Sequence, residues 1–444
     1  MNIVHYSLGF PPFRTGGMTK FCMDLIEAQM HEGNTVTLIW PGRIQLFRKK
    51  TRFKLHKPVE GIGSCEIINP LPIPYDEGIT DIDLFLDEGD KSAYRKLFEK
   101  IKPDVIHIHT FMGLHKAFIE AAKEKGIFLA FTTHDFFPVC PRVTLVRDGR
   151  VCVSRYSCDD CAGCNSGGLS YKKMIALQSP VYQALKDSGV MKKLRSSHRR
   201  KALAEGNDIS VAEGKPGRAG DYIRLRNHYH QMLKMIDKIH YNSSVTAKVY
   251  GEFFDLPDYA VVPITHAAIG DHKEIKKYSD DRIRIRYLGG PSTAKGFYLL
   301  LDALDLLWKR KHSFQLDIHF MPPEERPYMN CHGRYDYSEL GDILNDTDVL
   351  VCPSIWFETF GYTVLEALSY GVPVIISDNV GAKDILAKDA GIIIDDIDSN
   401  KLFRVLDDLT AEKLSAMNRA IVETQSINTM DEMVSRINKE VYTV

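Results

Sequence analysis

Short apolar segments rich in β-branched residues alternate with longer amphipathic segments along most of this chain. Residues 2–7 (NIVHYS) are typical of a strand and precede a glycine-rich turn. Apolar side chains at Phe21, Leu25, Ile26 and Met30 then recur at helical spacing. The segment TVTLIW reads as the next strand, and the same order of strand, helix and strand follows it. Such alternation predicts an α/β fold with parallel sheets covered on both faces by helices.

The alternation stops near residue 138 and resumes near residue 236. Segment 138–235 therefore reads as an insertion, with a cysteine-rich loop first and helical, basic sequence after it. A second α/β series then runs from RIRIRYLGG to GIIID. We expect two doubly wound domains that face each other across a cleft, over 1–255 with the insertion and over 256–425. A helix over 426–444 is expected to pack back on the N-terminal domain.

Composition narrows the class of protein. A chain of 444 residues exceeds what one hydrophobic core usually supports, and 44% hydrophobic and 26% charged residues are ordinary for a soluble protein. The formal net charge of -1 gives no global reason to expect nucleic acid as a partner. The start MNIVHYS lacks the features of a signal peptide, and no apolar run approaches the ~18 residues that span a bilayer. We expect a cytoplasmic protein, in a compartment where disulfides are disfavoured.

The densest chemical signal is the segment 354–378, SIWFETFGYTVLEALSYGVPVIISD. A strand enters a loop here, and a helix is expected to begin near Phe360 and Gly361. Free backbone N–H groups at a helix start bind phosphate or sugar oxygens. Glu358 in the loop and Glu366 in the helix can face the cleft and accept hydrogen bonds from different parts of one long ligand. Two ordinary surface glutamates are the alternative, and the flanking glycine, threonine and apolar pattern argues against it.

This segment resembles the Glu-x7-Glu signature of retaining GT-B glycosyltransferases, in particular glycosyltransferase family 4 (group 1). The resemblance extends over both α/β series and leaves out most of 138–235. It implies the GT-B fold of two Rossmann-like domains, a nucleotide-sugar donor that we expect to be UDP- or GDP-linked, and no cofactor for catalysis. It also implies that Glu358 contacts the transferred sugar and Glu366 the ribose, with backbone amides around Phe360 and Gly361 at the donor sugar and diphosphate.

A second donor element is YLGGPSTAKG, residues 287–296. Lys295, at a helix start after a glycine turn, can meet a diphosphate together with the helix-end amides. The family usually presents an arginine where this chain has Gly290. Either Gly290 lets the backbone approach the phosphate, or another cation such as Arg14 or Arg334 supplies the missing charge.

The N-terminal half offers further candidates at strand ends. Gly16 and Gly17 allow positive φ and close backbone approach, and the resemblance places such a loop beside the donor phosphates and the acceptor. A plain βα turn is the alternative. His134 ends the strand FTTHD, and the resemblance implies that it reaches the donor sugar near the reacting carbon. Asp135 would orient the His134 imidazole or bind an acceptor hydroxyl, and His109 in VIHIHT is a further acceptor-side candidate for the cleft.

These candidates predict glycosyl transfer to a glycan or lipid-linked acceptor, with retention of configuration, in the synthesis of a cell-surface polysaccharide or glycoconjugate. His134, Glu358 and Lys295 are the expected catalytic residues, because charge that develops on the leaving phosphate needs a cation and helix-end amides. An inactive GT-B relative that serves as a binding or partner subunit is the main alternative. A nucleotide-sugar epimerase, a glycogen-type phosphorylase and a nucleic-acid-binding protein are the others, and the last lacks aromatics interleaved with its basic residues.

The insertion contains a basic run at 192–201, KKLRSSHRRK, without an acidic residue. A solvated helix face explains such a run. It is also compatible with peripheral docking to an anionic membrane at the inner face, where each Lys or Arg near the surface is worth about 1 kcal/mol.

Five of the nine cysteines fall in the same insertion. They are Cys140, Cys152, Cys158, Cys161 and Cys164, the last three spaced C-x2-C-x2-C. Two-residue gaps let thiolates turn toward one centre, as in structural zinc sites with four ligands, so one of the five would be a spectator. Reduced thiols without metal, disulfides and an iron–sulfur cluster are the alternatives. We expect the cysteines to hold an acceptor-side insertion in place rather than to perform chemistry.

Overall fold

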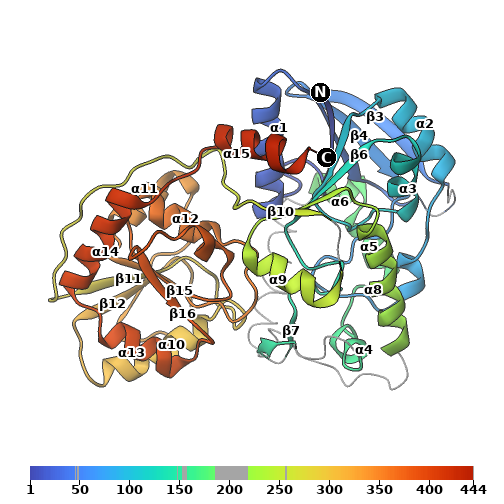
Figure 1. The fold of residues 1–444 in the computed structure, drawn as a ribbon. Coiled ribbons are helices and arrows are strands. Elements are labelled where there is room, and N and C mark those ends of the chain that lie inside the picture. The colour runs from blue at the N-terminus through green and yellow to red at the C-terminus, as the bar shows by residue number, and fades with distance from the viewer. Residues whose placement is uncertain are drawn as a thin grey trace.

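The structure is a computed structural model that describes residues 1–45, 47, 50–147, 149–152, 158–185, 219–255 and 258–443. It contains two large and mainly parallel sheets, one in each half of the chain, with helices on the faces of both (Figure 1). The basic run 192–201 lies outside the described residues.

The N-terminal sheet has eight strands in the order β10-β9-β6-β5-β1-β2-β4-β3, and its neighbours are parallel except for β3 and β4. The strands are β1 (Asn2–Tyr6), β2 (Thr35–Pro41), β3 (Arg52–Val59), β4 (Ile62–Ile68), β5 (Val105–Ile108), β6 (Phe128–Thr133), β9 (Lys238–Tyr241) and β10 (Tyr259–Val261). The strand order reverses at β1, which lies between β2 and β5. Ligands of doubly wound folds bind at the carboxyl ends of the strands at such a switch point, so the loops after β1, β5 and β6 are well placed for a site.

The N-terminal sheet extends past the boundary expected at residue 255, because β10 pairs with β9 in register from Tyr259 to Val261. The sequence hides this strand, since it is only three residues long and begins at Tyr259, shortly after a helix that ends at Phe253. The helices of this half are α1 (Gly17–His31), η1 (Ile82–Phe85), α2 (Lys91–Ile101), α3 (Lys116–Glu124) and α9 (Ser244–Phe253).

The insertion contributes a small hairpin and a group of helices near the carboxyl end of β6. Its described elements are β7 (Val146–Arg147), β8 (Arg150–Val151), α4 (Cys161–Cys164), α5 (Tyr171–Leu177), α6 (Pro180–Leu185) and α8 (Ala219–Leu233). Buried Tyr222, Leu225 and Tyr229 of α8 join the hydrophobic core of the N-terminal half, so the insertion is part of that domain.

The C-terminal sheet has six parallel strands in the order β13-β12-β11-β14-β15-β16. The strands are β11 (Ile283–Tyr287), β12 (Phe314–Ile318), β13 (Met329–Cys331), β14 (Val349–Cys352), β15 (Val374–Ser377) and β16 (Gly391–Ile394). The helices are α10 (Phe297–Trp308), η2 (Tyr337–Glu339), α11 (Leu340–Asn345), α12 (Tyr362–Ser369), η3 (Gly381–Ile385), α13 (Ser399–Asp407) and α14 (Ala411–Thr424). The switch point of this sheet lies between β11 and β14.

The last segment crosses back to the N-terminal half. Helix α15 (Met430–Arg436) and the π-helical turn η4 (Ile437–Val441) lie beside α1 in Figure 1. Buried Met433 and Val434 share one hydrophobic cluster with Phe21 and Leu25 of α1. The segment therefore ties the two halves together by apolar burial. No helix among the described residues has both the length and the apolar character needed to cross a membrane.

Candidate active site between the two sheets

Two loops at the switch point of the C-terminal sheet are tied to each other. They follow β11 and β14, which are neighbouring strands. The backbone N–H groups of Ile355 and Trp356 both donate to the carbonyl of Ala294, at 2.9 and 3.0 Å. Gly296 adopts φ 75°, and a Cβ there would come within 1.9 Å of the carbonyl oxygen of Pro353. Only glycine fits this close approach, which brings the side chains of the two loops together.

Lys295 and Glu358 form an ion pair at this junction. Nζ of Lys295 lies 3.6 Å from Oε2 of Glu358, and Nε1 of Trp356 donates to the same oxygen at 2.9 Å. The lysine ammonium also lies 5.7 Å from the centre of the Trp356 ring. Side-chain exposure is 42% for Lys295 and 20% for Glu358, so the carboxylate is oriented while the cation remains open to an anionic ligand.

Helix α12 begins beside this ion pair. Gly361 precedes the helix with φ 100°, and the side chain of Phe360 is buried beneath it. The start of α1 approaches from the other half, since a Cβ at Gly17 would lie 3.3 Å from the ring of Tyr362. Gly17, Lys295, Glu358 and Gly361 all line one pocket. Two helix N-termini and one ammonium therefore face the same space, an arrangement that favours an anion such as a diphosphate.

Glu366 borders a second pocket rather than the first, together with Tyr337, Gly341 and Tyr370. Its Oε1 lies 3.3 Å from Nε2 of His266, and both side chains are buried. The hydroxyl of Tyr337 lies 3.4 Å from the same imidazole nitrogen. The two glutamates thus contact separate spaces, as expected if they bind different parts of an elongated ligand.

His134 lies at the end of β6 against the loop of the C-terminal half. Its carbonyl accepts a hydrogen bond from the hydroxyl of Thr359 at 3.3 Å, one residue beyond Glu358. The imidazole stacks on His109, with ring centres 5.4 Å apart, and its Nε2 lies 3.2 Å from Nδ1 of His109. Burial lowers the pKa of His134 to about 3, so the ring is neutral near pH 7.

The roles expected for Asp135 and His109 change in the structure. Of the two roles expected for Asp135, the structure does not show the first, orientation of the His134 imidazole: that ring hydrogen-bonds to His109, and Oδ1 of Asp135 accepts the N–H of Phe137 at 2.9 Å. Burial raises the pKa of Asp135 to about 6. His109 is fully buried and does not line the cleft, because both faces of this central parallel strand are covered.

A chain of hydrogen bonds fixes the tautomers of the buried histidines. The carbonyl of Val262 can only accept, so Nε2 of His240 donates to it at 2.7 Å. Nδ1 of neutral His240 then accepts from the Thr132 hydroxyl at 2.8 Å. Because that hydroxyl has one proton, it must accept from Nε2 of His107 at 2.6 Å. Nδ1 of His107 consequently accepts from the hydroxyl of Tyr442 at 2.8 Å.

The chain continues in the same direction to His134. Tyr442 accepts from the amide nitrogen of Gln29 at 3.1 Å, and the amide oxygen of Gln29 accepts from Nε2 of His5 at 2.8 Å. Nδ1 of His5 accepts from Nε2 of His109 at 2.9 Å, so Nδ1 of His109 accepts from Nε2 of His134. His134 therefore carries its proton on Nε2 and keeps the lone pair of Nδ1 for another donor.

The directions of these hydrogen bonds also exclude a metal site among the buried histidines. Among the described residues, His5, His107 and His109 are the one group whose ligand atoms come within 4.8 Å of one another. Each ring nitrogen of the three already donates or accepts a hydrogen bond, so no lone pair is left for an ion. The group is a hydrogen-bonded histidine cluster.

Two family models match the chain. The model described as Glycosyltransferase Family 4 matches residues 15–160, and the model described as Glycosyl transferases group 1 matches residues 328–425. Together they cover just over half of the chain, and they include His134 in the first region and Glu358 and Glu366 in the second. The chain belongs to the group 1 glycosyltransferases of family 4.

A curated relative of this glycosyltransferase is a Klebsiella pneumoniae protein described as "Uncharacterized 41.2 kDa protein in cps region". It is 28% identical over 145 residues, which are 32% of this chain. The matched stretch spans only 39% of that relative's length.

Solved structures similar to this glycosyltransferase cover nearly the whole chain. Sucrose-phosphate synthase from Thermosynechococcus elongatus has a TM-score of 0.55 at 13% identity, covering 98% of this chain and 97% of its own. The α,α-trehalose-phosphate synthase (UDP-forming) from Burkholderia xenovorans, in complex with glucose-6-phosphate, has a TM-score of 0.54 at 11% identity. This match covers 99% of the present chain and 100% of the synthase. Anabaena HepE in complex with UDP has a TM-score of 0.52 at 14% identity, and the match covers 99% of the present chain and 100% of HepE. These likenesses confirm the GT-B fold expected from the sequence.

The cation missing at Gly290 has a candidate replacement that the sequence did not indicate. The guanidinium of Arg14 donates to the carbonyl of Leu8 and to the hydroxyl of Tyr75, and Arg334 is exposed. Lys20 lies in the first turn of α1, one turn after Gly17, with its ammonium 6.0 Å from the ring of Tyr337 in the other half. This ammonium is paired with Asp24 at 3.0 Å, so Lys20 brings an ion pair of the N-terminal half to the edge of the second pocket.

Proposed function

We propose that this protein transfers a sugar from a nucleotide-sugar donor to a hydroxyl group of a glycan or lipid-linked acceptor. The observation that carries the proposal is the ion pair of Lys295 and Glu358 at a pocket faced by the starts of α1 and α12. A cation and two helix N-termini suit a diphosphate, and a carboxylate beside them suits sugar hydroxyls. Membership of the family supports the same activity.

The donor would lie along α12. Its diphosphate would contact Lys295 and the backbone around Gly361, its sugar would contact Glu358, and its ribose would hydrogen-bond to Glu366 in the second pocket. His266 and Tyr337 support this assignment, because Nε2 of His266 lies 3.3 Å from Oε1 of Glu366 and Tyr337 also hydrogen-bonds to this carboxylate, which holds it in place for a vicinal diol. We favour UDP as the nucleotide, since one similar structure is a UDP-forming synthase and another contains UDP.

The reaction would break the bond between the anomeric carbon and the β-phosphate oxygen. Lys295 and the helix-end amides would stabilise the charge that develops on the leaving phosphate. The acceptor oxygen would bond to the same face of the anomeric carbon, and its proton would pass to the leaving phosphate oxygen. His134 would accept a hydrogen bond from a donor-sugar hydroxyl at Nδ1, the nitrogen that the histidine chain leaves with a lone pair.

The acceptor side would be the carboxyl edge of the N-terminal sheet. Asp135 follows His134 there, and its carboxylate would accept a hydrogen bond that orients the acceptor hydroxyl, while the proton passes to the leaving phosphate oxygen. Synthesis of a cell-surface polysaccharide or glycoconjugate, at the inner face of a membrane, fits an acceptor on a lipid carrier. Flotation with anionic liposomes, using wild type and a variant with the basic residues of 192–201 neutralised, tests the membrane contact.

Donor binding is tested by a thermal-shift panel of UDP-, GDP- and ADP-sugars on the wild type. One nucleotide class is expected to raise the melting temperature, and the shift should be lost in Lys295→Gln. If none of the donors stabilises the protein, the donor site is assigned wrongly. If a donor binds but is neither transferred nor hydrolysed, the protein is an inactive relative that acts as a binding subunit.

A further inference from the structure

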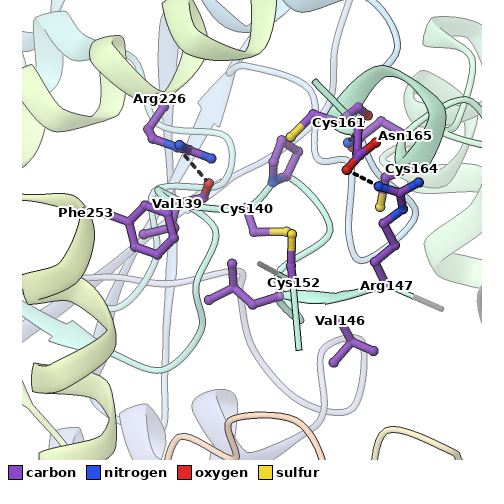
Figure 2. A pocket seen from close by; sticks show the side chains of 13 residues that line it. Val139, Cys140, Val146, Arg147, Cys152, Cys161, Cys164, Asn165, Arg226 and Phe253 are labelled. Carbon is purple, nitrogen blue, oxygen red and sulfur yellow. Dashed lines mark hydrogen bonds and ion pairs between the residues drawn. The ribbon is translucent and has the colours of Figure 1, made fainter. Parts of the chain in front are cut away.

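Four thiols of the insertion surround one pocket that is separate from the donor site. Cys140, Cys152, Cys161 and Cys164 all line it, and Figure 2 shows their side chains around the same space. They come from three places in the chain: the loop after β6, the end of the β7–β8 hairpin and the single turn α4. Cys158 does not line this pocket.

The thiols that line this pocket also interact with one another electrostatically. Cys140 interacts with Cys152, Cys161 and Cys164, and Cys152 interacts with Cys164 as well. Cys158 interacts with Cys161 alone among the cysteines, through a hydrogen bond between the two side chains. Cys158 therefore contacts Cys161 but does not line the pocket that the other four thiols share.

Nearby N–H groups of the backbone and of one arginine donate hydrogen bonds to two of the sulfur atoms. Sγ of Cys140 accepts from the N–H groups of Arg142 and Leu145, and Sγ of Cys164 accepts from the Arg142 guanidinium. Cys161 and Cys164 are one turn apart and project from the same side of α4. N–H donors directed at sulfur stabilise a thiolate, as the outer ligand shell of metal sites does.

Three arginine side chains near the pocket favour a negatively charged metal–thiolate centre over neutral thiols or disulfides. Arg142 and Arg147 interact electrostatically with Cys164, and Arg226 with Cys161. Four thiolates and one divalent ion carry a net charge of about -2. The three guanidiniums would balance it, since one of them, Arg147, is paired with the carboxylate of Asp160.

We propose that Cys140, Cys152, Cys161 and Cys164 bind one zinc ion in a structural site. A tetrahedral zinc–thiolate centre has Zn–S distances of about 2.3 Å. Among the described residues, no three of these sulfurs lie within 4.8 Å of one another, so the side chains must rotate to reach the ion. Rotation between staggered rotamers can bring the sulfur atoms closer together.

The site would fix the insertion against the acceptor side. Cys140 is six residues beyond His134, and the backbone N–H of Cys140 donates to the carbonyl of Phe136 at 2.7 Å. At the other end, Oδ1 of Asn165, directly after α4, accepts the N–H of Ile79 at 3.0 Å. Zinc would close the loop between these two anchors, beside the strand end that carries His134 and Asp135.

The test is metal analysis of the full chain, purified without chelators, for the wild type and three variants. About one zinc per chain is expected in the wild type and in Cys158→Ser. A loss of most of the zinc, with a lower melting temperature, is expected in Cys161→Ser and Cys140→Ser. Zinc near zero in the wild type, or equal zinc in Cys158→Ser and Cys161→Ser, would overturn the proposal.

A second measurement keeps the test decisive if a variant fails to fold. Cobalt(II) that replaces zinc in the wild type should give the intense visible absorption of tetrahedral thiolate coordination, and a chelator should make four thiols reactive. Iron with acid-labile sulfide, or a mass two units lower for each cysteine pair, would instead establish a cluster or disulfides and contradict zinc.

Discussion

The hydroxyl of Tyr442 donates a hydrogen bond of 2.8 Å to Nδ1 of His107, which joins the C-terminal segment to the centre of the N-terminal sheet. The residues lie 335 positions apart in the chain. Through Gln29, His5 and His109, this hydroxyl is also connected to Nε2 of His134. The docking of the C-terminal segment thus sets which nitrogen of His134 carries the proton.

Removing this hydroxyl should weaken the fold and disturb His134. In Tyr442→Phe, Nδ1 of buried His107 loses its donor, which should lower the free energy of unfolding by about 1–3 kcal/mol. The tautomer of His134 should become mixed, which nitrogen NMR of labelled histidine measures directly. Tyr259→Phe, which alters an exposed tyrosine, is the control. A stability loss without any change in the His134 spectrum would show that Tyr442 has only a packing role.

Acid should destabilise the protein steeply below pH 6.5. Burial lowers the pKa of His5 and His240 to about 4 and that of His134 to about 3, and those of His107 and His109 fall well below the usual value. The unfolded chain therefore binds protons that the folded chain does not, and stability falls as the pH drops from 6.5 toward 4.

The size of this effect follows from the number of protons taken up on unfolding. Each histidine contributes up to about 1.4 kcal/mol per pH unit. Asp135 has the opposite sign, because burial raises its pKa to about 6 and the folded state holds its proton longer. Urea unfolding at a series of pH values measures the slope. A free energy of unfolding that stays constant between pH 7 and 5 would contradict the neutral histidine chain.

Loss of the ammonium at the donor pocket should weaken donor binding. Lys295→Gln should raise the donor dissociation constant about 10- to 100-fold, since a hydrogen bond to a charged group contributes about 1.5–3 kcal/mol. Isothermal titration with the donor found in the thermal-shift panel measures the change. Lys309→Gln, at the end of α10 in the same half, is the matched control and should bind like the wild type. Equal losses in the two variants would exclude a specific role for Lys295.

His266 and Glu366 should act as a unit on the ribose. Glu366→Gln and His266→Ala should each weaken binding of the nucleoside diphosphate, and the double variant should lose less than the sum of the two. The wild type should discriminate against the 2′-deoxy nucleotide, and Glu366→Gln should lose most of that discrimination. Additive effects with unchanged discrimination would place the ribose elsewhere.

The sequence indicated those parts of the molecule that depend on local patterns. The hydrophobic periodicity predicts both sheets. The segment with Glu358 and Glu366 indicates the family, because its glycine and carboxylate positions all lie in one loop and the helix that follows it. His109 was expected in the cleft but is buried, because the sequence of a strand that is covered on both faces does not show which of its side chains reach the cleft. His266, Lys20 and Tyr442 were missed, because their roles arise from contacts between segments far apart in the chain.

The central claim is that this pocket turns over a nucleotide sugar, and release of free nucleoside diphosphate from the bound donor tests it most directly. With water or an added glycan as acceptor, the wild type should release the nucleotide of one donor class. Glu358→Gln should bind that donor with similar affinity and release its nucleotide at least about 100-fold more slowly, in line with the loss of one transition-state group. Equal release by the two proteins, or no release from any donor that binds, would contradict the account.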